Sequence, residues 1–266
     1  MTPRGDPAPA GRIALHGGGE FEAGDEPFLD AIIAAALPSS AARAQGDEPD
    51  AEGTLRIVVV PVAAARERPS ASAKQARAGL KLAAARAGVP AKIEAALVVD
   101  HVTAEDPVVA ARLAGADLIY LPGGHPDLVP GLLAGTLAWR SMLAAHARGA
   151  VLAGASAGAM GLAGRTWTPA GWLPGLNLVP GIFVAPHFGM FEANLEAWAT
   201  AIDELETAGF GRLGLDERTG VISTDGANGP WHVAGEGRAH WFPVGGGHAV
   251  AVHGETLDVT PQILPD

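Results

Sequence analysis

The chain has 266 residues, of which 48% are hydrophobic and 18% charged, so it can bury a large core and is expected to be a globular protein. Its formal net charge of −11 argues against nucleic acid and anionic membranes as partners and favours a small molecule or a peptide. The absence of cysteine excludes disulfides, thiolate metal sites and a cysteine nucleophile. No hydrophobic signal region and no apolar run of roughly 18 residues is present, so we expect a cytoplasmic protein.

Short apolar runs alternate with stretches of helical character along most of the chain. The predicted strands are residues 13–16, 55–62, 95–99, 117–121, 150–153 and 181–185. The predicted helices are residues 27–37, 70–87, 106–114, 128–148 and 191–208. This alternation predicts an α/β fold, a three-layer sandwich with a mostly parallel central sheet, whose ligands gather at the carboxyl ends of the strands.

Two segments are too polar and too rich in helix breakers to join a core. Residues 1–11 are expected to be a disordered N-terminus, and residues 39–53 a mobile loop. From residue 213 onward, brief strands are interrupted at 225–226, 228–229 and 235–237, a pattern that predicts antiparallel hairpins finishing the sheet. Residues 12–266 are therefore expected to form a single α/β domain.

One serine stands where an apolar run meets a turn of small residues. The spacing Gly154-x-Ser156-x-Gly158 fits a nucleophile elbow, a sharp strand-to-helix turn that exposes the serine hydroxyl. The flanking Ala155 and Ala157 keep bulk away from a substrate, and the N–H of Ala157 is free to bind an oxyanion. Ser156 is thus the candidate nucleophile, against the alternative of a chance glycine-serine turn.

Two other glycine clusters follow predicted strands. The turn at 17–19 lacks the lysine and the glycine spacing of a phosphate site, so a plain tight turn is expected there. Gly123 and Gly124 could supply the second half of an oxyanion hole opposite Ala157, although Pro and Gly also make ordinary turns. His125 follows this turn directly and is a candidate substrate contact.

A nucleophilic serine needs a base, and His187 has the most suitable setting among the nine histidines. It follows the apolar run 181–185, so it would stand at the end of a neighbouring strand, within reach of Ser156. There it could take the serine proton and return it to the leaving amine. Without Ser156, a structural hydrogen-bonding role would be the simpler interpretation.

Several motifs in order resemble the peptidase S51 family, which includes aspartyl dipeptidase and cyanophycinase on a class I glutamine amidotransferase-like α/β fold. They are Pro122-Gly-Gly, Gly-Ala-Ser156-Ala-Gly-Ala, Gly175-Leu-Asn-Leu-Val-Pro-Gly, Ala185-Pro-His187-Phe and Gly214-Leu-Asp-Glu. The resemblance implies that Ser156 is the nucleophile, His187 the base, and Gly123 or Gly124 with Ala157 the oxyanion hole.

The resemblance also implies an acidic third member of the triad, placed between the serine and the histidine. Residues 157–186 contain neither Asp nor Glu, so either another group orients His187 or the activity is low. Asp216 and Glu217 are the acidic candidates, and Asn177 or a backbone carbonyl could orient the imidazole without charge. Arg165 is the one basic residue that we match to substrate binding, and the family's specificity for aspartate is not carried over.

These observations predict a serine hydrolase that cleaves amide bonds of small peptides through an acyl-enzyme, with neither metal nor cofactor. The expected partner is a small peptide, not nucleic acid or membrane, and a homodimer is left open. Two alternatives remain: an S51-like binding protein without turnover, favoured by the missing acid, and an esterase or amidase acting on a non-peptide acyl group. A glutamine amidotransferase would need a cysteine, and an α/β-hydrolase would place its histidine late in the chain, after the acid.

Overall fold

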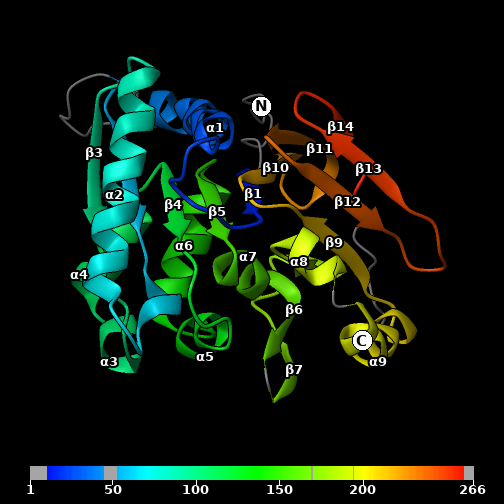
Figure 1. Ribbon diagram of the computed structural model, residues 1–266. Coiled ribbons are helices and arrows are strands. Elements are labelled where there is room, and N and C mark those ends of the chain that lie inside the picture. Colours follow the sequence, from blue (N-terminus) through cyan, green and yellow to red (C-terminus); the bar gives the residue numbers. More distant parts are fainter. Residues whose placement is uncertain (1–10, 45–52, 169, 194, 261–266) are drawn as a thin grey trace, which may run out of the picture.

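The computed structural model describes residues 11–44, 53–168, 170–193 and 195–260. In these ranges the larger sheet has the strand order β14-β11-β10-β1-β5-β4-β2-β3 (Figure 1). Strands β1 to β5 run parallel, and β10 pairs antiparallel with β1. The strands are β1 (Ile13–His16), β2 (Leu55–Val59), β3 (Ala91–Ala95), β4 (Leu118–Leu121), β5 (Val151–Ala155), β10 (Thr219–Asp225), β11 (Asn228–Gly235) and β14 (Thr256–Leu257).

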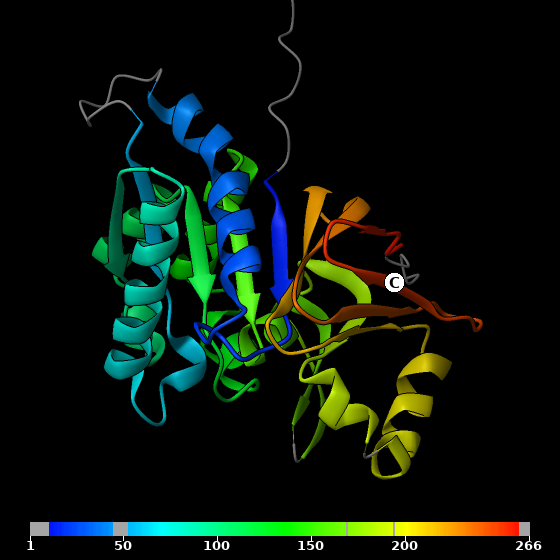
Figure 2. The ribbon, with the colours of Figure 1, turned by 45° about the horizontal axis from the view of Figure 1, so that its top comes forward.

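Helices cover both faces of the parallel strands. Helices α1 (Glu26–Ala44) and α2 (Pro69–Arg86) lie on one face, where Phe28 and Leu80 belong to the same buried cluster as Ala14 of β1 (Figures 1 and 2). Helices α4 (Pro107–Ala114) and α6 (Leu137–Ala147) lie on the other, with Ile13 in their core. Neighbouring residues of β1 thus point to opposite faces, as a buried parallel strand requires, and the predicted layers are confirmed.

A second sheet, absent from the sequence-based prediction, has the order β13-β12-β9-β8-β6-β7. It packs against β10 and β11 of the larger sheet, where Trp231 and Val233 meet Ala239, Trp241 and Ala251 in one buried cluster. The sequence predicted that the late hairpins finish a single sheet. This prediction is correct for β10, β11 and β14 and wrong for β9, β12 and β13, which belong to the second sheet. The strands are β6 (Ala163–Thr168), β7 (Gly171–Pro174), β8 (Val179–Ala185), β9 (Gly211–Leu215), β12 (Arg238–Phe242) and β13 (Ala249–Val252).

Several predicted boundaries shift because local turns end the elements. The third strand occupies Ala91–Ala95, because these residues pair with β2, and the predicted 95–99 overlaps it by one residue only. The second strand ends at Val59 and is followed by the short 3-10 helix η1 (Val62–Ala64). The predicted helix 128–148 is two helices, α5 (Leu128–Leu133) and α6, since Gly135 has φ +74° and Thr136 caps α6. The predicted helix 191–208 is likewise split into α8 (Phe188–Glu192) and α9 (Leu195–Thr207). The remaining helices are α3 (His101–Ala104) and α7 (Ala157–Leu162).

The two segments predicted to lack structure, residues 1–11 and 39–53, each include residues that belong to the fold. Helix α1 continues to residue 44, and Ser39 and Ser40 are buried, the former donating to Asp117 Oδ1 at 3.3 Å. Tertiary contacts therefore extend the helix past Pro38, and the predicted loop is wrong for residues 39–44. Gly11 is also buried, and its N–H donates to the carbonyl of His146 at 2.9 Å. Residues 1–10 and 45–52 of these predictions lie outside the described residues.

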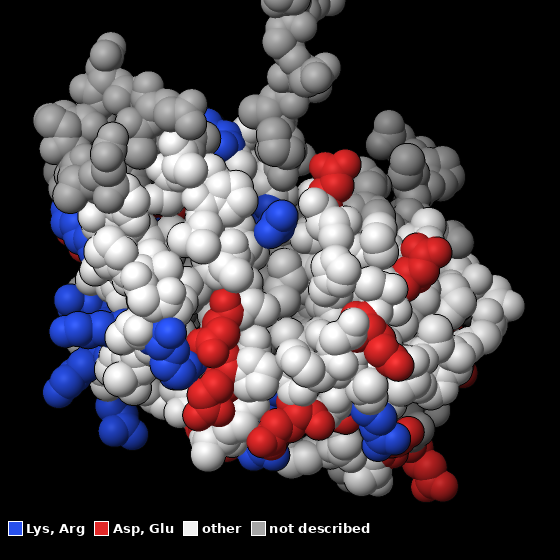
Figure 3. Space-filling model, turned by 90° about the horizontal axis from the view of Figure 1, so that it is seen from above, with Lys and Arg blue, Asp and Glu red and all other residues white. Residues whose placement is uncertain are grey.

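One face of the molecule carries charges of both signs, gathered in different regions (Figure 3). On the face shown in Figure 3, Lys and Arg side chains gather mainly towards the left edge, whereas Asp and Glu lie in the middle and on the right. Of the helices in the described ranges, none combines the length and apolar character needed to cross a membrane.

Candidate active site

Ser156 occupies a strained turn between β5 and α7. Its φ of 49° and ψ of −114° are unusual for a residue with a side chain. The turn depends on its two glycines: a Cβ on Gly154 would lie 2.6 Å from the carbonyl carbon of Gly158, and one on Gly158 would lie 2.2 Å from the oxygen of Leu121. The Ser156 N–H donates to the carbonyl of His16 at 2.9 Å. This is the geometry of a nucleophile elbow.

The three glycine turns meet because β1, β5 and β4 are neighbours in the sheet. The N–H of Gly123 donates to Glu20 Oε1 at 3.0 Å, so one of the predicted oxyanion donors is occupied by a carboxylate. In the described part of the chain, the N–H groups of Gly124 and Ala157 donate to no other protein group. Those two amides are thus the donors open to a ligand beside Ser156.

Three side chains form a chain of hydrogen bonds at this edge. Ser156 Oγ lies 3.0 Å from His187 Nε2, and His187 Nδ1 lies 2.8 Å from Glu217 Oε1. The imidazole is held in place by its backbone, since the His187 N–H donates to the carbonyl of Gly17 at 2.7 Å. It also packs on Gly18, where an added Cβ would lie 2.2 Å from the ring. Such a chain can move a proton from a serine hydroxyl to an imidazole oriented by a carboxylate.

His187 reaches Ser156 from the other sheet. It follows β8, which pairs with β6 and β9 and not with β5, so the expectation of neighbouring strands in one sheet is wrong. Glu217 follows β9, the strand beside β8. The site therefore lies where the edges of two sheets meet, the serine on one and the histidine and carboxylate on the other.

Of the three candidates for orienting His187, Glu217 is the one in contact with it. The carboxylate of Asp216 turns away and accepts the N–H of Arg238 at 2.9 Å. Asn177 lies in the loop before β8, its N–H bonded to the carbonyl of Ala163 at 3.1 Å. The carboxylate thus follows the histidine in the chain, where a search between residues 157 and 186 cannot find it.

The two candidate substrate contacts lie elsewhere. His125 Nε2 lies 2.9 Å from Glu67 Oε1, and its backbone N–H bonds to Ala63. The guanidinium of Arg165 stacks over the ring of Phe210, 5.2 Å from its centroid. Neither residue lines the cavities beside Ser156, so the structure does not bring them to the nucleophile.

Two cavities of different character open on Ser156. The first, of about 320 Å³, is mostly apolar, and its lining includes His187 together with Met160, Trp167, Trp172 and Phe183. The second, of about 250 Å³, has walls of mixed character and contains a carboxylate, and we call it the polar cavity. Its lining includes Glu20, Phe21, Ser72, Gln75 and the turn at 122–124. Across the described ranges, no group of three or more His, Asp or Glu side chains is arranged to hold a metal ion.

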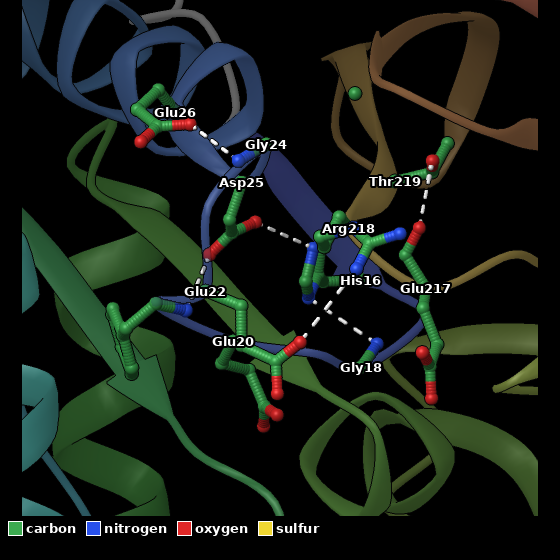
Figure 4. A network of polar contacts seen from close by, with 12 residues as sticks. His16, Gly18, Glu20, Glu22, Gly24, Asp25, Glu26, Glu217, Arg218 and Thr219 are labelled. Atoms are coloured by element: carbon green, nitrogen blue, oxygen red, sulfur yellow. Dashed lines mark hydrogen bonds and ion pairs between the residues drawn. The ribbon is translucent and has the colours of Figure 1, made fainter.

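A buried His-Asp pair belongs to a network of polar contacts in the loop that follows β1 (Figure 4). His16 Nε2 lies 2.9 Å from Asp25 Oδ1, and both side chains are almost completely buried. Asp25 Oδ2 accepts the N–H of Phe21 at 2.7 Å, and His16 Nδ1 accepts the N–H of Gly18 at 3.3 Å. The pair therefore sets the path of residues 17–25, which carry Glu20 to Gly123.

Sequence reasoning did not identify Glu20, His16 or Asp25 as parts of the site. A signal was available, because the run 17–20 follows a strand whose neighbour carries Ser156. A ring stacking contact between His16 and Phe28, with centroids 4.4 Å apart, completes the packing of the pair.

Tyr120 is buried near this loop. Burial and the nearby charges of Glu20 and Asp25 raise the pKa of Tyr120 well above its usual range, so its phenol stays neutral.

Comparison with known proteins gives a family and a fold for the chain. Residues 52–227 match the model of peptidase family S51. The structure resembles the crystal structure of a peptidase from an acI-B1 actinobacterium, with a TM-score of 0.75 and 24% identity over 95% of this chain and 98% of that one. It also resembles a putative peptidase E protein from Listeria monocytogenes EGD-e, with a TM-score of 0.51 and 16% identity over 85% of this chain and 98% of that one.

Both structures share the fold that the motifs predicted, a class I glutamine amidotransferase-like α/β arrangement. Among curated protein sequences, none matches the chain. The family match spans the elbow, His187 and Glu217, which are the residues that meet at the edge of the two sheets. The chain therefore belongs to peptidase family S51.

Proposed function

We propose that this protein is a serine-type peptidase that cleaves small peptides through an acyl-enzyme. The observation that carries the proposal is the chain of hydrogen bonds from Ser156 through His187 to Glu217, at 3.0 and 2.8 Å. It lies at the edge where two open backbone amides and two cavities also meet. Nucleophile, base, orienting carboxylate and oxyanion donors are the parts that acyl transfer needs.

In this mechanism Ser156 Oγ attacks the scissile carbonyl while its proton passes to His187 Nε2. Glu217 accepts a hydrogen bond from the Nδ1–H of His187 and, as a carboxylate, stabilises the imidazolium that forms. The N–H groups of Ala157 and Gly124 hold the oxyanion of the tetrahedral intermediate. His187 then gives its proton to the amine as the peptide bond breaks, and the acyl group stays on Ser156 as an ester. The neutral imidazole next takes a proton from a water molecule, which attacks the ester and releases the acid.

The binding-protein alternative rested on a missing acid, and Glu217 supplies a carboxylate in contact with the imidazole. The polar cavity favours peptides over esters. The polar cavity offers a carboxylate, Glu20, next to the nucleophile, a group suited to the ammonium of a peptide and of no use to a neutral ester.

The proposal is tested by intact-mass analysis after treatment with a broad fluorophosphonate, for the native chain, Ser156→Ala and His187→Ala. We expect one adduct on the native chain, none on Ser156→Ala, and labelling slowed by about 10³-fold or more in His187→Ala. Thermal melting of each variant shows whether it is folded. A native chain that takes no label, or an equal label on folded Ser156→Ala, would refute the proposal.

A further inference from the structure

We propose that the two cavities select the two halves of the substrate, an inference that rests on the proposed function. The leaving residue carries a large apolar or aromatic side chain, which the cavity at Trp167 and Trp172 binds. The acyl residue carries a free α-ammonium, which the carboxylate of Glu20 binds. The preferred substrate is then a short peptide with an unblocked N-terminus and an apolar second residue.

The position of His187 decides which cavity takes which half. His187 delivers a proton to the leaving amine, so the leaving residue must lie on the side of Ser156 that His187 faces. His187 lines the apolar cavity and does not line the polar one. The open amide of Gly124 belongs to the turn that lines the polar cavity. The polar cavity is therefore the one that takes the acyl residue.

The apolar cavity is formed by aromatic rings held in fixed contact. The rings of Trp167 and Trp172 meet edge to face with centroids 5.2 Å apart, and Trp172 meets Phe183 in the same way at 5.0 Å. Trp172 Nε1 donates to the carbonyl of Ala201 at 2.9 Å, which fixes that ring. A cavity of about 320 Å³ with such walls binds an apolar side chain without first having to order its own side chains.

The polar cavity carries a negative charge close to the nucleophile. Glu20 Oε1 accepts the N–H of Gly123, and among the described residues no Lys, Arg or His forms an ion pair with Glu20. Its charge is therefore left for a cationic ligand. Glu22, two residues further along the chain, does form an ion pair, because its Oε2 lies 3.7 Å from Arg218 Nη1.

The distances favour an α-ammonium over the end of a long side chain. A Cβ placed on Gly123 would lie 2.9 Å from Glu20 Oε1 and 3.7 Å from Ser156 Oγ, so both oxygens flank the same point of the backbone. In an N-terminal residue, the ammonium nitrogen and the scissile carbonyl are bonded to one Cα. A lysine ammonium lies several bonds further from the carbonyl and would extend beyond Glu20.

The experiment measures kcat/KM for four peptides, Ala-Phe, Ala-Ala, N-acetyl-Ala-Phe and N-acetyl-Lys-Phe. With the native chain we expect Ala-Phe to exceed Ala-Ala by about 10- to 100-fold, from burial of the phenyl ring. We expect Ala-Phe to exceed both acetylated peptides by a similar factor, from the lost charge-assisted hydrogen bond. In Glu20→Gln the preference for the free ammonium should fall below about 3-fold, while the preference for Phe remains.

The matched control is Glu22→Gln, which makes the same chemical change two residues away and should leave both preferences unchanged. Trp167→Ala should reduce the preference for Phe, and Met160→Ala serves the same purpose should the first variant not fold. Fluorophosphonate labelling is run on every variant, so that a loss of the nucleophile is told apart from a loss of selectivity. A native chain that takes no label would overturn the proposed function and this inference together.

The other outcomes separate the two halves of the inference. Equal rates for Ala-Phe and Ala-Ala in a labelled native chain would overturn the role of the apolar cavity. An unchanged preference for the free ammonium in labelled Glu20→Gln would overturn the role of Glu20. Turnover of N-acetyl-Lys-Phe equal to that of Ala-Phe would overturn the assignment of the α-ammonium, because a side-chain cation would then serve as well.

Discussion

Replacing Glu217 by Gln tests the role of the orienting carboxylate. Gln has the same size, and its amide oxygen can still accept a hydrogen bond from the Nδ1–H of His187, so the variant removes the charge and keeps the hydrogen bond. The charge stabilises the imidazolium that forms as Ser156 attacks. The prediction is that Glu217→Gln acylates slowly while it folds and binds normally.

The size of the loss follows from the contact. Unit charges about 4 Å apart at an effective dielectric constant of about 20 attract by about 4 kcal/mol, which corresponds to a rate factor of about 10³. The Glu217 side chain is 42% exposed, so water screens part of this attraction. We therefore expect a 10²- to 10³-fold decrease, less than the roughly 10⁴-fold that a buried triad carboxylate can supply.

The assay is the rate of fluorophosphonate adduct formation, followed by intact mass, with thermal melting as the check on folding. The matched control is Asp216→Asn, the same change at the adjacent residue, whose carboxylate accepts the Arg238 N–H and does not touch His187. Asp216→Asn should acylate within about 3-fold of the native rate, since the His187 contact is intact. Native-like labelling of Glu217→Gln, or an equal loss in Asp216→Asn, would refute this reasoning.

Three more outcomes test the local physics of the site and the fold. Ser156→Gly should be more stable than Ser156→Ala by about 1 kcal/mol in urea unfolding, because the φ of 49° strains any residue with a Cβ; equal stabilities would contradict that strain. Gly18→Ala should slow labelling by about 10²-fold, because its Cβ would displace the His187 ring, whereas Gly189→Ala, with open space at its Cβ, should label normally; equal rates in the two variants would contradict the contact. Burial lowers the pKa of His146, so the unfolded chain takes up this proton at a higher pH than the folded chain does, and folded stability falls as the pH drops below about 6.5. The melting temperature of His146→Gln should therefore fall less than that of the native chain between about pH 7.5 and 5.5. An equal fall in both would show that His146 does not cause the pH dependence.

The sequence carried the parallel part of the fold and the nucleophile because both are local patterns. Apolar runs of strand length alternate with helical stretches, and this period fixes a sheet covered on two faces. The elbow around Ser156 needs only small residues at set spacing, and the spacing is visible in the chain. The expectation that the turn at 123–124 lies opposite the elbow also follows from the strand pattern, since parallel strands place their carboxyl ends at one edge.

Only the tertiary structure decided which distant groups complete the site. The second sheet depends on pairing between β6, β8, β9 and β12, and single-strand patterns do not encode partner choice. Placing Glu217 on His187 requires β8 and β9 to be neighbours, so sequence alone left three candidates. Glu20 reaches Gly123 because the buried pair of His16 and Asp25 shapes its loop. The order of the strands places this loop near Ser156, but the contact itself depends on the tertiary structure.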